Sequence, residues 1–248
     1  MLRPVEFNPA RNPWPGQPHQ RRFDDVVAEA RSLVEAGYKD ITLLGQNVNS
    51  YGRDLDEGRD FADLIRAIND IPGDFLIRFM TSHPRDATEK LFRTMAECEK
   101  CAKHIHLPVQ SGSNRILKAM NRHYGREKYL EEVRTARELM PDIVLTTDII
   151  VGFPGETRSD FDETLSLVRE VGYDAMFTFI FSPREGTPAA KLPDPVSREE
   201  KQVWFDELVE LANSISGEKH AAYAGKTLRV LVDGETGRDG YNLSARTN

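Results

Sequence analysis

One segment of the sequence combines a short apolar run with a polar, glycine-rich turn of the kind that binds small molecules. Residues 146–157 read TTDIIVGFPGET, in which the run that ends at Val151 is followed by Gly152, Pro154 and Gly155, ahead of a helical pattern. In βα proteins the loops at the carboxyl ends of the strands carry the functional sites. Glycines there let the backbone approach a ligand closely, because no Cβ intervenes. A tight turn with no ligand would use the same residues.

The same arrangement recurs along the chain, which makes a shared ligand-binding edge the better interpretation. Further apolar runs end in polar or glycine-rich turns at residues 41–44, 75–80, 105–107 and 175–181. Helical patterns cover residues 23–36, 61–71, 87–98, 126–140 and 159–171. Strands that alternate with helices of this length indicate parallel βα units, and therefore an α/β fold with a barrel or a doubly wound sheet.

Composition and length narrow the class of protein. The chain has 248 residues, with 33 Lys and Arg against 40 Asp and Glu, so its whole surface is not a nucleic-acid clamp. It contains no apolar run of about 18 residues and no signal-peptide pattern, so we expect no membrane insertion and no secretion. Two cysteines without a signal fit a reducing compartment, and we expect a cytoplasmic protein.

The two ends of the chain differ from its middle. Residues 1–20 hold five prolines and no periodicity, and we expect an irregular lead-in without a strand. Beyond a long helical pattern at 197–222, residues 226–232 alternate as a strand and 233–237 resemble a turn. A strand and part of a hairpin cannot close a β domain, so we expect residues 224–248 to be the start of a truncated β module.

Six ordered motifs give the chain a resemblance to a known family. They are LLGQNVNSYG at 43–52, SHP at 82–84, HIHLPVQSGS at 104–113, KAMNRHYGREKYLE at 118–131, TTDIIVGFPGET, and FTFIFSPREGTPAA at 177–190. Together they closely resemble the radical S-adenosylmethionine (radical SAM) methylthiotransferases. The GQNVN version is typical of the branch that acts on isopentenyladenosine in tRNA. The resemblance covers roughly residues 21–248.

The resemblance implies a fold, a reaction and partners. The fold would be an incomplete radical-SAM TIM-like (βα) barrel core over residues 21–223, followed by the start of a TRAM-like module that contacts tRNA. The barrel would hold S-adenosylmethionine beside a [4Fe-4S] cluster, with a second cluster in an N-terminal domain that is missing here. The reaction would add a methylthio group to C2 of N6-isopentenyladenosine, next to the anticodon in the tRNA anticodon stem-loop. Cofactors carry such chemistry, and the protein positions them.

The chain departs from this family at the cluster. The resemblance implies a C-x3-C-x2-C loop after the first barrel strand, but residues 8–22 contain no cysteine, and Cys98 and Cys101 are the only thiols. Three thiolates cannot come from two. We expect the first strand to be missing as well, which would leave the edge of the 41–44 strand unpaired. Two interpretations stay open: a fragment of the enzyme that is inactive alone, or a degenerate, non-catalytic remnant that binds S-adenosylmethionine or tRNA.

The cysteines also allow a zinc interpretation. Cys98 and Cys101 are followed by His104 and His106, which gives four possible ligands within nine residues. The alternative is that the cysteines end a helix while the histidines lie on one face of the next strand. We assign no metal ligand, and we place His106 in the substrate cleft from its position in the motif.

The remaining candidate residues follow from their places in the motifs. The resemblance places Gly45, Gln46 and Asn47 at the amino and carboxylate groups of S-adenosylmethionine, where side-chain amides supply both donors and acceptors. Ser82, Gln110 and Asp148 end later strands and would reach ribose or substrate. Gly152, Pro154 and Gly155 resemble the turn beside the adenine. For substrate or RNA we assign three arginines and one histidine: Arg122, Arg126, Arg184 and His106. A solvated helix face would explain the basic residues equally well.

Overall fold

The computed structural model describes residues 20–45, 47–55, 58–80, 82–236 and 240–247, and the backbone of 5–7. The chain divides into two compact units, which we describe one at a time. The first comprises residues 1–105, 136–143 and 225–248, and the second comprises 106–135 and 144–224.

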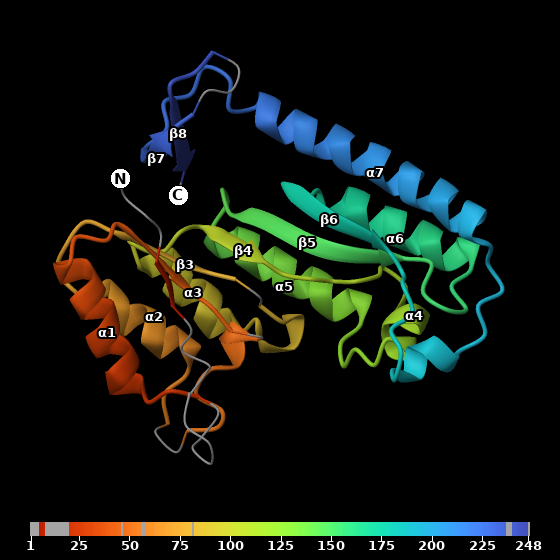
Figure 1. The fold of residues 1–248 in the computed structure, drawn as a ribbon, viewed down its shortest axis with the longest axis horizontal. Helices are drawn as coiled ribbons and strands as arrows, with labels where there is room; N and C mark the ends of the chain where they lie inside the picture. The colour runs from red at the N-terminus through yellow and green to blue at the C-terminus, as the bar shows by residue number, and fades with distance from the viewer. Residues whose placement is uncertain are drawn as a thin grey trace. The chain divides into compact units, whose positions relative to one another are not determined.

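Strands and helices alternate along the chain (Figure 1). The helices are α1 (Phe23–Glu35), α2 (Phe61–Asn69), α3 (Glu89–Glu97), α4 (Asn114–Ala119), α5 (Arg126–Leu139), α6 (Arg158–Val171) and α7 (Arg198–Ala221). The strands are β1 (Val5–Phe7), β2 (Asp40–Leu43), β3 (Leu76–Phe79), β4 (His104–His106), β5 (Val144–Val151), β6 (Ala175–Ile180), β7 (Val230–Glu235) and β8 (Leu243–Thr247). The short 3-10 helices are η1 (Val48–Ser50), η2 (Pro84–Asp86) and η3 (Pro188–Lys191).

The first unit contains a parallel three-stranded sheet in the order β1-β2-β3. β2 and β3 pair in register from Asp40 with Leu76 to Leu43 with Phe79, so both strands end at the same edge. Ile41, Leu43 and Ile77 are fully buried against the helices, because alternate residues of a covered strand face the core. α2 begins at a capping box formed by Asp60 and Asp63 and packs against β3.

The lead-in contains a strand, which the sequence analysis did not predict. Val5–Phe7 pairs in parallel with Ile41, Thr42 and Leu43 of β2. The sequence analysis missed this strand for two reasons. The many prolines suggested an irregular segment, and three residues are too few to show a period. The edge of β2 is therefore paired, and the expectation that the first strand is missing was wrong. Residues 8–19, which follow β1, lie outside the described residues.

The second unit contains β5 and β6, which with β4 form a sheet in the order β4-β5-β6. β5 and β6 pair in parallel, with Asp148 opposite Phe177 and Ile150 opposite Phe179. Figure 1 shows α6 beside this pair, and α7 packs against both β6 and α6. One face of β5 is buried through Thr147, Ile149 and Val151, while Asp148 and Ile150 on the other face are partly exposed.

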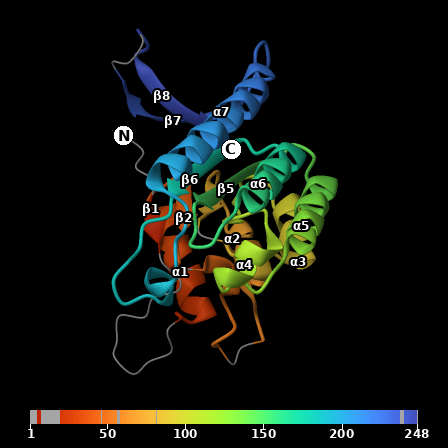
Figure 2. The ribbon, with the colours of Figure 1, turned by 90° about the vertical axis from the view of Figure 1, so that its right-hand side faces the viewer.

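The last strands form the antiparallel pair β7–β8, with a bulge between Val232 and Gly234, and Figure 2 shows them as a separate two-stranded ribbon. Within the first unit this hairpin is tied to the sheet by Arg246, whose Nη1 lies 3.4 Å from Oδ2 of the buried Asp40. Val230, Val232 and Leu243 remain exposed. No helix in the described part of the chain is both long and apolar enough to cross a bilayer.

The alternation of strands and helices was predicted well. All the helical patterns predicted from 3.6-residue periodicity are helices whose ends differ by at most two residues, for example α2 and α6. α4 was not predicted, because its six residues are too few to show a period. β7 begins later than the alternation suggested and continues through Asp233 and Gly234, which had been expected to turn.

Candidate functional site

In the first unit, the segments that follow β2 and β3 are joined by one asparagine. The side chain of Asn49 accepts a hydrogen bond from the backbone N–H of His83 (2.9 Å) and donates one to the carbonyl of the same residue (3.0 Å). Asn49 is buried, so both bonds are shielded from water. The two motifs GQNVN and SHP are therefore fixed to one another at a single sheet edge, through residues 34 positions apart in the sequence.

Asn47 is held by a second link between the same segments. Its Nδ2 donates a hydrogen bond of 2.6 Å to Oδ2 of Asp86, the last residue of η2. Asp86 is buried and also accepts hydrogen bonds from Arg53 and Arg85. Gly45 and Gln46 were predicted to share the site of Asn47. Gly45 lies in the segment after β2, and Gln46 lies outside the described residues.

Two polar atoms at this edge have no hydrogen-bond partner within the described part of the chain. Among the described residues, the buried atoms Asn47 Oδ1 and Ser82 Oγ are both unpaired. Buried polar atoms are almost always paired, and each exception calls for an explanation such as a bound molecule. Because β2 and β3 end at the same edge, these two predicted residues form a candidate ligand site within the first unit.

The second unit contains a cavity of about 530 Å³ at the carboxyl ends of β5 and β6. It has aromatic and aliphatic walls with a few polar groups: Gln110, Asp148, Ile150, Phe179, Phe181 and Arg184. Binding sites for small molecules have this size and this mixture of surfaces. The cavity brings together three residues predicted from separate motifs, at positions 110, 148 and 184.

Gln110 has an unusual backbone conformation in this cavity. Its φ angle is 72°, in the left-handed region that residues other than glycine rarely adopt. Its backbone donates a hydrogen bond to Asp148 and accepts one from Ile150, both 2.9 Å long, which hold the strained turn against β5. Strained residues of this kind concentrate at functional sites.

His106 lies beside the cavity residue Asp148 and is buried. Its Nδ1 lies 3.0 Å from Oγ1 of Thr146, and its Nε2 lies 3.4 Å from Oδ1 of Asp148. The ring packs edge-on against Phe177, with the ring centroids 5.8 Å apart. The imidazole therefore orients Asp148 but does not itself line the cavity, and only 8% of the residue is exposed.

The glycine-rich turn after β5 is built around a buried carboxylate. Gly152, with a φ angle of 72°, donates its backbone N–H to Oε2 of Glu156. Burial raises the pKa of Glu156 to about 7, although two backbone N–H groups and Lys201 oppose this shift. Only 1% of Glu156 is exposed.

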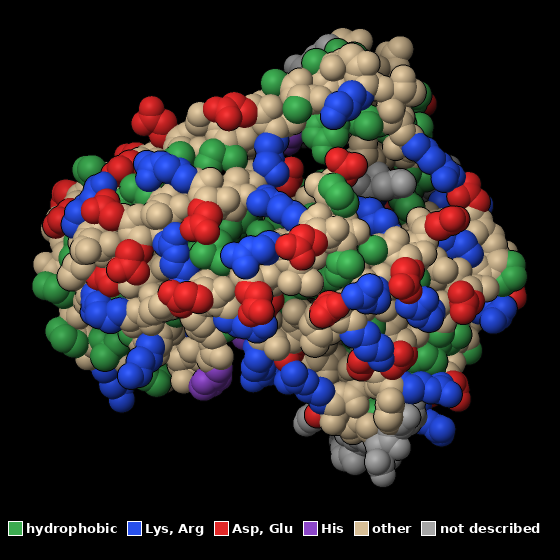
Figure 3. All heavy atoms as spheres, turned by 180° about the vertical axis from the view of Figure 1, so that it is seen from behind, with side chains coloured by type: hydrophobic (Ala, Val, Ile, Leu, Met, Phe, Trp, Pro, Cys, Tyr) green, Lys and Arg blue, Asp and Glu red, His purple; other side chains and the backbone are tan. Residues whose placement is uncertain are grey.

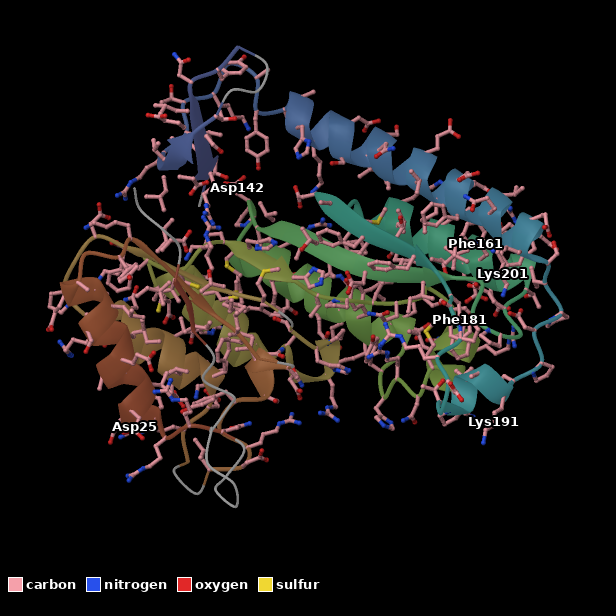
Figure 4. The ribbon with its side chains drawn as sticks, in the orientation of Figure 1. Asp25, Asp142, Phe161, Phe181, Lys191 and Lys201 are labelled. Carbon is pink, nitrogen blue, oxygen red and sulfur yellow. The ribbon has the colours of Figure 1, made fainter. Side chains whose placement is uncertain are left out.

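The space above Gly152 is taken by the protein's own side chain. A Cβ at Gly152 would lie 2.5 Å from Cδ of Lys201, whose stem crosses the turn from α7. Lys201 on α7 and Phe161 on α6, both labelled in Figure 4, come from two helices that pack together, and Phe161 stacks on Trp204 of α7. The expected close approach at Gly152 is thus to Lys201. Pro154 is buried, and neither it nor the glycines of this turn line the cavity.

The arginines predicted to contact RNA are partly engaged in contacts within the second unit. Arg126 donates to the carbonyl of Glu163, the hydroxyl of Ser166 and the carboxylate of Glu170, so the predicted RNA contact would have to break these bonds. Arg122 differs, because its buried Nε has no acceptor among the described residues. On the face in Figure 3, acidic and basic side chains are interspersed.

A parallel βα sheet with a polar strand edge and a nucleoside-sized cavity defines an α/β ligand-binding or enzyme domain. The profile of the Radical SAM superfamily matches residues 7–168. The chain therefore belongs to the radical SAM superfamily.

Individual relatives agree with this placement. The chain is 53% identical over 232 residues to the tRNA-2-methylthio-N(6)-dimethylallyladenosine synthase of Clostridium botulinum, and matches that of a Thermoanaerobacter species equally well. These matches cover 94% of this chain but 52% and 49% of the relatives, so the chain spans about half their length.

Solved structures show the same fold at low sequence identity. Coproporphyrinogen III oxidase from Escherichia coli, a radical SAM enzyme, superposes with a TM-score of 0.57 at 18% identity, covering 78% of this chain and 45% of that one. The radical S-adenosylmethionine methyltransferase TsrM from Kitasatospora setae gives 0.55 at 19% identity, covering 69% and 33%.

The family's iron–sulfur cluster does not fit the residues of this chain. Cys98 and Cys101 are buried and free, and burial raises the pKa of Cys101 to about 12, which favours the neutral thiol over the thiolate that binds iron. Within the described residues, no group of three or more His, Cys, Asp or Glu side chains is arranged to hold a metal ion.

S-adenosylmethionine, in contrast, fits what the structure offers. In the described part of the first unit, Asn47 Oδ1 and Ser82 Oγ are unpaired groups that suit an amino acid. Considered by itself, the cavity of the second unit has aromatic walls and a carboxylate, which suit a nucleoside. The sequence analysis missed the residues that support these groups, Asn49, Asp86, Glu156 and Lys201. The only sequence feature that pointed to such residues was the presence of Asn49 in GQNVN and of Asp86 in SHPRD, because contacts between distant segments leave no period in the sequence.

Proposed function

We propose that this chain is the part of a tRNA methylthiotransferase that binds S-adenosylmethionine and the target nucleotide. The reaction would add a methylthio group to C2 of N6-dimethylallyladenosine beside the anticodon. The observation that carries the proposal is the 53% identity over 232 residues to synthases named for that product. Such a protein would work in the cytoplasm, where tRNA is found.

The residues of the first unit would bind the amino acid part of S-adenosylmethionine. Asn47 Oδ1 would accept a hydrogen bond from the ammonium group of S-adenosylmethionine. Ser82 Oγ would donate one to the carboxylate of the same ligand, since a hydroxyl can donate as well as accept. When bound, S-adenosylmethionine supplies the methyl group. Gly45 and Gln46 belong to the same proposed site through their motif.

The cavity of the second unit would receive an adenine nucleoside. Phe179 and Phe181 offer aromatic surface for a base, and the Asp148 carboxylate, oriented by His106, would accept hydrogen bonds from ribose hydroxyls. Arg184 is exposed at the rim, where its guanidinium would balance a phosphate. The nearby turn with Gly152, Pro154 and Gly155 would hold β5 in place below the base. S-adenosylmethionine and the tRNA nucleotide both contain adenosine, so binding must be tested with each.

Contacts with RNA would extend beyond the cavity. Arg122 has an unpaired Nε, and Arg126 would contact phosphate only by exchanging its present partners. The β7–β8 hairpin, with exposed Val230 and Leu243, would be the start of a TRAM-like module over residues 224–248 that contacts tRNA. Cluster binding and radical generation would require an N-terminal domain and a cysteine loop supplied by a longer chain.

The proposal is tested by two binding experiments on the chain. Calorimetry measures S-adenosylmethionine binding, and fluorescence anisotropy compares anticodon stem-loops that carry N6-dimethylallyladenosine or adenosine. We expect binding of S-adenosylmethionine, and tighter binding of the prenylated stem-loop at every salt concentration. Absence of S-adenosylmethionine binding together with equal affinity for the two stem-loops would contradict the proposal.

A second function is favoured by the cysteine count. With two buried thiols, the chain alone would be a non-catalytic module that binds S-adenosylmethionine or tRNA. The two functions differ in one measurement, which is formation of 5′-deoxyadenosine after anaerobic reconstitution with iron, sulfide and a strong reductant. The module produces none, whereas an enzyme that recruits ligands elsewhere produces it.

A further inference from the structure

Asp86 is a buried acid whose hydrogen-bond partners are all donors. Only 3% of the residue is exposed. Its Oδ2 accepts from Nδ2 of Asn47 at 2.6 Å, and its Oδ1 accepts from Arg53 and, at 3.4 Å, from Nε of Arg85. Every one of these partners donates, and a carboxylate only accepts hydrogen bonds.

This restricts the orientation of the Asn47 side chain. An amide has one accepting and one donating end, and only the donating end can face the accepting oxygens of a carboxylate. Nδ2 therefore faces Asp86, and Oδ1 must face the other way. The argument depends on chemistry alone, because the opposite orientation would place two acceptors against each other.

The backbone of Asn47 is fixed as well. Its carbonyl accepts hydrogen bonds from the hydroxyl (2.7 Å) and the backbone N–H (3.1 Å) of Ser50. Asn49 ties the same segment to His83 at both its N–H and its carbonyl. The side chain is thus held through Nδ2 and the backbone through its carbonyl, and Oδ1, which is buried and unpaired among the described residues, is a preformed acceptor.

We propose that Asp86 is a positioning residue that sets the polarity of the Asn47 amide, so that the site selects a ligand with a donating, positively charged amine. The inference rests on the proposed function, in which that amine is the ammonium group of S-adenosylmethionine. Asp86 does not touch the ligand. It acts by excluding the amide orientation that would present N–H groups to the ammonium.

The test compares two ligands that differ only in the amine. S-adenosylmethionine and its des-amino analogue, in which hydrogen replaces the ammonium group, are titrated by calorimetry into the chain and into Asp86→Asn. An asparagine at this position both donates and accepts, so the Asn47 amide is free to reverse. Arg53→Gln is the matched control, because it removes another partner of Asp86 and leaves the Asn47 contact in place. Circular dichroism confirms folding of each variant.

We expect the unaltered chain to bind S-adenosylmethionine about tenfold more tightly than the analogue, which is the usual effect of one hydrogen bond to a charged group. Asp86→Asn should lose this preference with little change in its affinity for the analogue, and Arg53→Gln should keep it. A preference that persists in Asp86→Asn would overturn the inference, and so would equal weakening of both ligands, which indicates a purely structural role. Binding of neither ligand by the unaltered chain would overturn the S-adenosylmethionine assignment itself.

A measurement on the unaltered chain covers the case in which Asp86→Asn does not fold. The side-chain NH2 signals of Asn47, assigned by their loss in Asn47→Ala, should exchange slowly with solvent in the free chain and remain slow when S-adenosylmethionine binds. Fast exchange, or release of the NH2 group on binding, would show that Asp86 does not hold the amide.

Discussion

Replacing Glu156 by Gln should remove a pH dependence from the stability of the second unit. Burial raises the pKa of Glu156 from its ordinary 4.5 to about 7. A carboxyl whose pKa is higher in the folded state stabilises the fold while it is protonated. That stabilisation is complete below pH 4.5 and disappears as the pH rises through 7.

The magnitude follows from the size of the shift. A displacement from 4.5 to about 7 corresponds to about 3 kcal/mol, of which about 2 kcal/mol falls between pH 5.5 and 8.5. Gln keeps an oxygen that accepts the Gly152 N–H but carries no charge. The free energy of unfolding of Glu156→Gln, relative to the unaltered chain, should therefore rise by about 2 kcal/mol from pH 5.5 to pH 8.5.

Urea unfolding followed by circular dichroism at both pH values measures this difference. Glu218→Gln, at an exposed position of α7, controls for the loss of one negative charge. A difference between Glu156→Gln and the unaltered chain that is equal at the two pH values would refute the reasoning. It would mean that water reaches the carboxylate in the folded state.

Three further predictions concern the turn, the ligand and the cysteines. Gly152→Ala should destabilise the chain by about 2–4 kcal/mol in urea unfolding, because φ at this position is positive and the added Cβ would meet Lys201. Adding Lys201→Ala should relieve part of this cost. If the effects of the two substitutions simply add, the contact is contradicted. Asn47→Ala should weaken S-adenosylmethionine binding in calorimetry by about 1–3 kcal/mol with circular dichroism unchanged, and unchanged affinity would place the ligand elsewhere. Anaerobic reconstitution should leave no stable [4Fe-4S] cluster by iron analysis, and about four irons per chain would require ligands beyond Cys98 and Cys101.

The alternation of strands and helices, and the strand ends near which the candidate sites lie, could be predicted from the sequence. Amphipathic helices such as α2 and α6 show a 3.6-residue period, and the polar turn after β5 follows directly from a buried run. Residues such as Asn47 and Arg184 could be chosen because each follows a strand, whereas Asp148, expected at a strand end, lies within β5. Segments without a period, such as β1 and α4, were missed.

Only the tertiary structure decided what these residues contact. The sequence suggested a ligand above Gly152, and the fold places Lys201 there. It suggested RNA for Arg126, whose guanidinium is bonded to Glu170. The physical reason is that a period records which face of an element is buried, whereas hydrogen bonds such as those from Asn47 to Asp86 and from Asn49 to His83 join segments more than 30 residues apart. Such contacts depend on how the strands are paired, and that pairing exists only in the folded chain.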